Sequence, residues 1–198
     1  MARKRVGVLI SGRGSNMRAL VEAARDSNFP ADIVHVVSNK ADAAGLSWAQ
    51  AHGISTHVLS HSGFAARADY DRALNAHLQS QKLDLICCAG FMRIMTPVVL
   101  SPWAGRMLNI HPSLLPAYKG LHTHERAIAE GAKTHGATVH FVTPELDGGP
   151  IIAQAAVPVL PDDTADSLSA RVLTVEHPLY VKALALVASG AIHMNTSP

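Results

Sequence analysis

Runs of apolar residues alternate with helical patterns over the first half of the chain. Four runs rich in Val, Ile and Leu have the length and composition of buried strands, and a shorter run follows the second of them. Between the runs, apolar positions recur every three or four residues, which is the period of an amphipathic helix. The pattern predicts strands over residues 5–10, 33–37, 56–59, 83–88 and 107–110, and helices after residue 16, over 42–52 and over 64–81.

Strands that alternate with helices predict an α/β fold, in which a mostly parallel, twisted, Rossmann-like sheet carries helices on both faces. The second half differs, because two strand-like segments flank a glycine turn and indicate an antiparallel C-terminal addition. A helical pattern over 164–189 follows, and Pro178 is expected to kink it, break it or open a second helix. No repeat or linker interrupts the chain, so residues 1–198 are predicted to form a single domain. The antiparallel segments are 138–142 and 151–157.

The predicted topology locates function before any motif is considered. Right-handed crossovers bring the loops that follow parallel strands to one edge of the sheet. Ligands of such sheets bind beyond the carboxyl ends of the strands. Function is therefore expected in the segments 11–16, 89–95 and 111–123.

Composition excludes several classes of protein. Hydrophobic residues make up 48% and charged residues 16% of 198 residues, which excludes a disordered chain. No apolar run approaches the roughly 20 residues of a membrane-spanning helix. A net charge of +2 and an aromatic content of 5% argue against nucleic-acid binding. The two cysteines, Cys87 and Cys88, are adjacent in an apolar run, so they are expected to be reduced thiols in the cytoplasm.

A glycine loop, SGRGSN at residues 11–16, lies between the first strand and the first helix. Free backbone N–H groups and the positive end of a helix favour a phosphate at such a position. The loop is neither a dinucleotide fingerprint, which has a third glycine, nor a P-loop, which continues with Gly-Lys-Ser/Thr. The alternative is a tight turn in which Ser15 or Asn16 caps the helix.

Asn109 and His111 end a predicted strand that turns into a loop bracketed by two prolines. Residues two apart in a strand share a face, so both side chains are expected to project together at the functional edge. An amide donor and an imidazole that carries a proton near neutral pH would stabilise negative charge on a carbonyl oxygen. The alternative is a turn-capping Asn beside a structural His.

Asp147 supplies a candidate carboxylate in the turn DGGP. Beside His111 it would favour the imidazolium and orient a water for proton transfer. An Asx turn before the glycines is the alternative. The pair His122 and His124 lacks further ligands at a recognisable spacing, so no metal site is predicted.

Taken together, these segments resemble the folate-dependent phosphoribosylglycinamide formyltransferases. The resemblance runs from about residue 6 to residue 193. It rests on SGRGSN at 11–16, SNKADA at 38–43, AGFMRI at 89–94, LNIHPSLLP at 108–116, GLHTH at 120–124 and ELDGGP at 145–150. It implies the formyltransferase fold and transfer of a formyl group from 10-formyltetrahydrofolate to the amine of glycinamide ribonucleotide in purine synthesis. It further implies a cytoplasmic enzyme without metal, acting as a monomer or homodimer.

The resemblance also implies roles for individual residues. His111 would donate a proton and stabilise the oxyanion, Asn109 would hold the same oxygen, and Asp147 would raise the pKa of His111. Thr138, where relatives often have Ser, would hold a water. The nucleotide phosphate would be bound by Gly14, Ser15 and Asn16, and its ribose by Glu176. Folate would be bound by Arg67, Met92, Arg93, Ile94, Met95 and Asn109, with Leu108 helping to form an apolar slot for the pterin.

Three other functions would account for part of the same pattern of motifs. A methionyl-tRNA formyltransferase shares the central motif but is expected to carry an additional RNA-binding domain. A formyltetrahydrofolate hydrolase would use the same three residues with water as acceptor, and it usually has an N-terminal regulatory domain. A nucleotide-binding module without catalysis would explain the glycine loop but not Asn109, His111 and Asp147.

Overall fold

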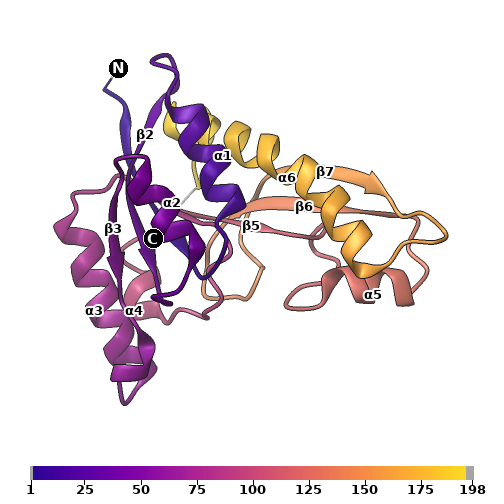
Figure 1. Cartoon of the computed structure of the whole chain (residues 1–198), viewed down its shortest axis with the longest axis horizontal. Helices are drawn as coiled ribbons and strands as arrows, with labels where there is room; N and C mark the ends of the chain where they lie inside the picture. Colours follow the sequence, from indigo (N-terminus) through magenta and orange to yellow (C-terminus); the bar gives the residue numbers. More distant parts are fainter. Residues whose placement is uncertain (1, 195–198) are drawn as a thin grey trace.

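A computed structural model describes residues 2–194, which form one sheet and the helices packed on it (Figure 1). The strands are β1 (Lys4–Ile10), β2 (Ala31–Ser38), β3 (Ser55–Val58), β4 (Leu85–Cys88), β5 (Met107–His111), β6 (Thr134–Phe141) and β7 (Ile151–Pro158). The helices are α1 (Ser15–Ala24), α2 (Ala44–Ala51), the short 3₁₀ helix η1 (His61–Gly63), α3 (Arg67–Ser80), α4 (Pro97–Leu100), α5 (Thr123–Ala129) and α6 (Ala165–Ala188).

The seven strands lie in the order β3-β2-β1-β4-β5-β6-β7. Strands β1 to β5 pair in parallel, and β6 and β7 are added antiparallel, as the sequence predicts. From β1 the chain moves outward through β2 and β3, then returns to the other side of β1 with β4. The space between the ends of β1 and β4 is therefore the switch point, where ligands bind in open α/β sheets.

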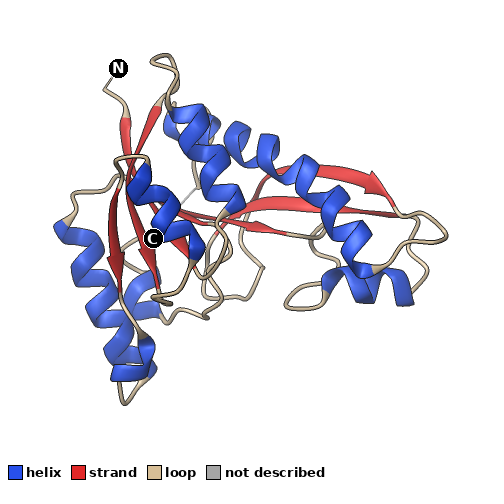
Figure 2. Cartoon of the chain, in the orientation of Figure 1, coloured by secondary structure: helices blue, strands red, loops and turns tan. Residues whose placement is uncertain are grey.

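Strand alternation divides the core into two layers. In β1, Val6, Val8 and Ile10 face the cluster that contains α1 and α6, whereas Leu9 faces the cluster that contains α3 and α4. The central strands β1 and β4 are buried because helices cover both faces of the sheet there, whereas the edge strand β3 is partly exposed. Figure 2 shows the two groups of helices on opposite sides of the strands.

Helix α6 runs without a break through Pro178, so the predicted break and the predicted second helix are wrong, and the kink stays a prediction. A proline in a helix removes one backbone hydrogen bond and costs about 3 kcal/mol. The residues next to Pro178 offset that cost, since Leu179 and Tyr180 are buried against the sheet. The Tyr180 hydroxyl also contacts the carbonyl oxygens of Cys88, at 3.0 Å, and Leu108, at 3.2 Å. Tertiary packing thus keeps Glu176 and Tyr180 on one continuous helix.

No helix among residues 2–194 is long and apolar enough to cross a membrane. The single domain over residues 1–198 stays a prediction. Residues 4–188 contribute all the strands and helices described above.

Three histidines join the sheet edge to α3, away from the predicted site. His35 Nε2 lies 2.8 Å from His77 Nε2, and His35 Nδ1 lies 3.1 Å from the Ser55 hydroxyl. The His57 ring stacks on His77 with centroids 3.8 Å apart. Burial, with smaller contributions from the neighbouring His77 and His57, lowers the pKa of His35 to about 4. Burial also lowers the pKa of His77, so the contact between His35 and His77 favours neutral rings.

This cluster predicts acid-sensitive stability. The folded-state pKa of His35 lies below its ordinary value of 6.5, so the native state binds fewer protons than the unfolded state. Stability present above pH 6.5 is therefore lost as the pH falls toward 4. His35→Val should reduce the acid-induced loss of unfolding free energy by on the order of 1 kcal/mol, after allowance for solvent screening. Urea unfolding at pH 7.0 and 4.5 measures it, with exposed His61→Val as control. An identical acid-induced loss in wild type and His35→Val would contradict the assignment.

Candidate active site

The glycine loop after β1 leaves the start of α1 without a side-chain cap. Gly14 is the N-cap residue, with φ of 70°, and no side chain caps the helix or adds an acidic group to its first turn. The alternative in which Ser15 or Asn16 is the cap is therefore wrong. A side chain at Gly14 would be strained by that φ and would have its Cβ 3.1 Å from Met17 Cε. The free N–H groups and the helix dipole favour an anion.

Asn16 and Glu176 meet beside this loop, although 160 residues separate them in the sequence. The Asn16 amide donates a hydrogen bond to Glu176 Oε2 at 2.6 Å, and both side chains are buried. Burial raises the pKa of Glu176, and the bond from Asn16 lowers it in part. Asn16 Oδ1 is buried without a protein partner. The two residues thus form a polar pair with unused hydrogen-bonding capacity next to the anion-binding turn.

His111 is held at the end of β5 by two groups from different loops. Its Nε2 lies 2.9 Å from the carbonyl oxygen of Tyr118. A carbonyl only accepts, so Nε2 carries a proton and Nδ1 is the ring nitrogen left for chemistry. Nδ1 lies 3.5 Å from Asp147 Oδ2, longer than an ordinary hydrogen bond of about 2.7–3.2 Å. Nδ1 is therefore the ring nitrogen that a substrate oxygen can approach, beside the Asp147 carboxylate.

Asp147 is fixed by backbone rather than by an Asx turn. Its Oδ2 accepts a hydrogen bond from the Gly120 N–H at 2.9 Å. This partner lies in another loop, so the alternative of an Asx turn is wrong. Asp147 and Tyr118 both have left-handed φ values, 48° and 55°, which non-glycine residues rarely adopt. The Lys119–Glu145 ion pair at 2.7 Å joins the same two loops. Together these contacts hold the carboxylate against His111.

His140 is a site residue that the sequence analysis missed. It lies opposite Asn109 in the antiparallel register of β5 and β6, and its Nε2 is 3.2 Å from Asn109 Nδ2. His140 Nδ1 donates to the Phe141 carbonyl at 2.9 Å, so Nε2 accepts. Burial lowers the pKa of His140 and keeps it neutral. One N–H of Asn109 is thereby spent on His140, and the second remains for a ligand. The role of His140 follows from the pairing of β5 with β6, and no motif in the sequence indicates it.

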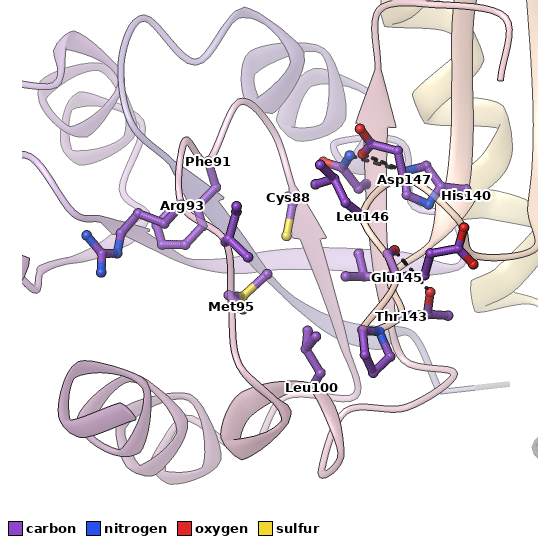
Figure 3. A pocket seen from close by; sticks show the side chains of 14 residues that line it. Cys88, Phe91, Arg93, Met95, Leu100, His140, Thr143, Glu145, Leu146 and Asp147 are labelled. Carbon is purple, nitrogen blue, oxygen red and sulfur yellow. Dashed lines mark hydrogen bonds and ion pairs between the residues drawn. The ribbon is translucent and has the colours of Figure 1, made fainter. Parts of the chain in front are cut away.

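A cleft beyond the strand ends is lined by Asn109, Asp147 and His140. Figure 3 shows the Asp147 and His140 side chains next to each other at this cleft. Of the predicted folate residues, Arg93, Ile94 and Met95 line it as well. The Arg93 side chain points away from the cleft, onto the Tyr70 ring at 4.4 Å. The further lining residues are Cys88, Phe91, Leu100, Val142, Thr143, Pro144, Glu145 and Leu146.

Three of the residues predicted for the folate site are not part of the cleft lining. Met92 is 65% exposed, and Arg67 is exposed at the start of α3. Leu108 is fully buried in the core, so it does not line an apolar slot. The alternation of side chains along β5 explains this, because Leu108 points to the face opposite Asn109.

Thr138 supports the loop after β5 rather than a water. Its hydroxyl donates to the Ser113 carbonyl at 2.7 Å, and it accepts from Leu115 N–H at 3.0 Å and Gln154 Nε2 at 2.9 Å. One proton and two acceptor positions are all that a hydroxyl has. The predicted water site at Thr138 is therefore already occupied by protein groups.

The histidines of residues 122–124 are not arranged as metal ligands. His124 Nδ1 faces His135 Nε2 at 3.2 Å, and His122 pairs with Glu125 at 3.5 Å. Burial lowers the pKa of both His124 and His135, to about 4 for His135. Within residues 2–194, no group of three His, Cys, Asp or Glu side chains is arranged to hold a metal ion.

Comparison with known proteins matches a family model described as formyl transferase over residues 4–184. The chain belongs to the formyl transferase family. Relatives within this formyl transferase family include a protein named phosphoribosylglycinamide formyltransferase from Escherichia coli (strain K12), 49% identical over 188 residues. That match covers 95% of this chain and 89% of the relative. The family resemblance predicted from the motifs is confirmed.

Two further relatives are a much longer protein and a protein of known crystal structure. A Drosophila melanogaster protein named trifunctional purine biosynthetic protein adenosine-3 is 50% identical over 190 residues, and the chain spans only 14% of its length. A crystal structure of phosphoribosylglycinamide formyltransferase from Brucella melitensis has a TM-score of 0.90 and 53% identity, with 96% of this chain and 98% of that chain covered. The predicted formyltransferase fold is confirmed.

The hydroxyl of Thr138 gives a stability prediction for this site. Thr138→Val leaves the Leu115 N–H and Ser113 carbonyl without their buried partner, which should cost about 2–3 kcal/mol of unfolding free energy. Urea denaturation measures it. Thr143→Val, which removes a half-buried hydroxyl with one long contact of 3.4 Å to the Glu145 carbonyl, should cost less than about 0.5 kcal/mol. Equal losses in the two variants would contradict the role given to Thr138.

Proposed function

We propose that this family member transfers the formyl group of 10-formyltetrahydrofolate to the amine of glycinamide ribonucleotide. The products are formylglycinamide ribonucleotide and tetrahydrofolate, a step of purine (IMP) synthesis. The name of the E. coli and Brucella relatives supports the acceptor. The observation that carries the proposal is that Asn109 and Asp147 line one cleft, with His111 Nδ1 3.5 Å from Asp147 Oδ2.

Attack of the neutral amine on the formyl carbon produces a tetrahedral intermediate with a negatively charged oxygen. The free N–H of Asn109 and the protonated Nδ1 of His111 are the donors that would stabilise this charge. Donors fixed in advance contribute most, because they need no reorganisation as charge develops. The Tyr118 carbonyl and His140 supply that fixation.

Asp147, whose Oδ2 lies 3.5 Å from His111 Nδ1, would stabilise positive charge that develops on the imidazole during proton transfer. In the second half of the reaction, the bond between the formyl carbon and N10 of the folate breaks. The departing nitrogen takes a proton, the attacking nitrogen loses one, and His111 with Asp147 mediates the exchange. This direct transfer requires neither a metal nor a covalent enzyme intermediate.

The nucleotide half of the proposed site is the start of α1. The phosphate would bind to Gly14, Ser15 and Asn16, supported by their uncapped N–H groups. Glu176, held by Asn16, would accept a ribose hydroxyl. The proximity of Asn16 and Glu176 at 2.6 Å supports one continuous nucleotide site.

Folate would occupy the cleft between residues 91–95 and 142–147. Arg93, Ile94, Met95 and Asn109 line this cleft, and Met92 remains a predicted contact of the folate. Arg67, exposed at the start of α3, remains a predicted contact for the outer part of the folate. The mixture of apolar walls and a few polar groups is typical of small-molecule sites.

The remaining expectations belong to the same proposal. The partners are two small molecules, with no nucleic acid and no membrane, and the enzyme acts as a monomer or homodimer. Two free, buried thiols at Cys87 and Cys88 support a reducing compartment, which we propose is the cytoplasm.

The proposal is tested by supplying glycinamide ribonucleotide and 10-formyltetrahydrofolate together and singly. Formylglycinamide ribonucleotide should form only when both are present. Release of formate from the donor alone would indicate a hydrolase, and no consumption of the donor under any condition would refute formyl transfer.

His111→Ala should lower kcat/KM by about a thousandfold or more, because proton transfer and oxyanion stabilisation are lost together. Circular dichroism should show a retained fold, since the residue ends a strand whose neighbours are unchanged. His193→Ala, an exposed histidine outside the site, should leave kcat/KM unchanged. Turnover within tenfold of wild type in His111→Ala would remove the proposed mechanism.

Ser15→Asp should weaken binding of glycinamide ribonucleotide at least about tenfold, because it adds a negative charge beside the phosphate. Isothermal titration calorimetry measures the dissociation constant. Ser47→Asp adds the same charge to an exposed position of α2 and should leave that constant unchanged. Equal affinity in wild type and Ser15→Asp would locate the phosphate elsewhere.

A further inference from the structure

The ends of three neighbouring strands meet at one serine hydroxyl. Ser11 follows β1, Asn39 follows β2, and Met92 lies in the loop after β4. The Ser11 hydroxyl donates to Asn39 Oδ1 at 2.6 Å and accepts the Met92 N–H at 2.8 Å. Ser11 and Asn39 are only 6% and 4% exposed. These contacts lie at the switch point between β1 and β4.

The loop that begins with Ser11 is also fixed on its other side. The Gly45 N–H at the start of α2 donates to the Gly12 carbonyl at 3.1 Å. Below the switch point, the Ala89 N–H donates to the Leu9 carbonyl at 2.9 Å. Backbone hydrogen bonds thus join the glycine loop and the strand ends, and Ser11 extends these contacts to Met92.

Residues 91–95 form one wall of the cleft, which we call the donor-binding wall. At Met92 this wall is barely packed against the rest of the protein. The Met92 and Ile94 side chains are 65% and 58% exposed, so burial does not determine where they lie. The wall is held from the other side by Asp71, whose Oδ2 accepts the Thr96 N–H at 2.5 Å. Phe91 and Met95 are partly buried against the core, and Met92 between them is held by the hydrogen bond from its N–H to Ser11.

We propose that Ser11 is a positioning residue that holds the donor-binding wall at residues 91–95 in register with the nucleotide loop. The Ser11 hydroxyl is not assigned to either substrate, because it donates its proton to Asn39 and accepts the Met92 N–H. It acts through Met92 N–H and Asn39. A wall that is held in place before binding costs the donor less free energy to order, which increases the affinity for the donor. This inference rests on the proposed formyl transfer.

Ser11→Ala should raise KM for 10-formyltetrahydrofolate about three- to tenfold, the range expected for one hydrogen bond. At saturating donor, kcat should recover to within about twofold of wild type, because His111, Asn109 and Asp147 are unchanged. A merely structural role would instead lower the folded, active fraction, and so lower kcat with KM unaltered. Ser11→Thr, which restores a hydroxyl, should return KM toward the wild-type value.

Ser38→Ala is the matched control. Ser38 ends β2, is fully buried, and its hydroxyl bonds only to the backbone of Lys40, at 2.9 and 3.0 Å. This variant removes a comparable buried hydroxyl without touching the wall, so donor KM should stay within twofold of wild type. If Ser11→Ala does not fold, Ser11→Cys replaces it, since a thiol of similar size is a weaker acceptor and should raise donor KM in the same direction.

Donor KM within twofold of wild type in Ser11→Ala, or in Ser11→Cys if that is the variant tested, would overturn the inference. An equal rise in Ser38→Ala would overturn it as well. Wild-type enzyme is assayed in parallel. Absence of formyl transfer by wild type would refute the proposed function, whereas active wild type with an unchanged donor KM in the variant would refute the role of Ser11 alone.

Discussion

The hydrogen bond from His111 Nε2 to the Tyr118 carbonyl decides what the imidazole can do. It fixes the proton on Nε2 and leaves Nδ1 to face Asp147 at 3.5 Å. A ring with the opposite tautomer would present a lone pair to a carbonyl oxygen and lose the contact. The chain commits a loop with a left-handed residue, Tyr118, to this geometry. Strain at such a position is retained where the surrounding structure determines it.

The antiparallel addition to the sheet serves the same end. Pairing of β5 with β6 sets His140 opposite Asn109 and Thr138 opposite His111. His140 orients the Asn109 amide, and Thr138 ties down the loop that follows His111. A parallel neighbour of β5 would have required a crossover, whereas the antiparallel strand supports both catalytic candidates from one side. The extra strands are thus part of the site and not only of the fold.

Local signals in the sequence predicted the strands, the edge of the sheet where the functional loops meet, the glycine loop and the candidates Asn109, His111 and Asp147. The resemblance added Glu176, which lies 160 residues from its partner Asn16. His140 and Tyr118 were missed, because their roles depend on strand register and on a backbone carbonyl, neither of which a residue type reveals. The break expected at Pro178 was wrong, since burial of Leu179 and Tyr180 outweighs one lost hydrogen bond. The water expected at Thr138 was wrong for a related reason, because protein groups already fill its hydrogen-bonding positions.

The most direct test of this account is the tautomer of His111, measured by ¹⁵N nuclear magnetic resonance with the His111→Gln spectrum used to assign its signals. The account predicts that in the neutral ring Nε2 carries the proton and Nδ1 does not, and that acidification adds the second proton at Nδ1. A neutral ring protonated on Nδ1, with an unprotonated Nε2, would contradict it.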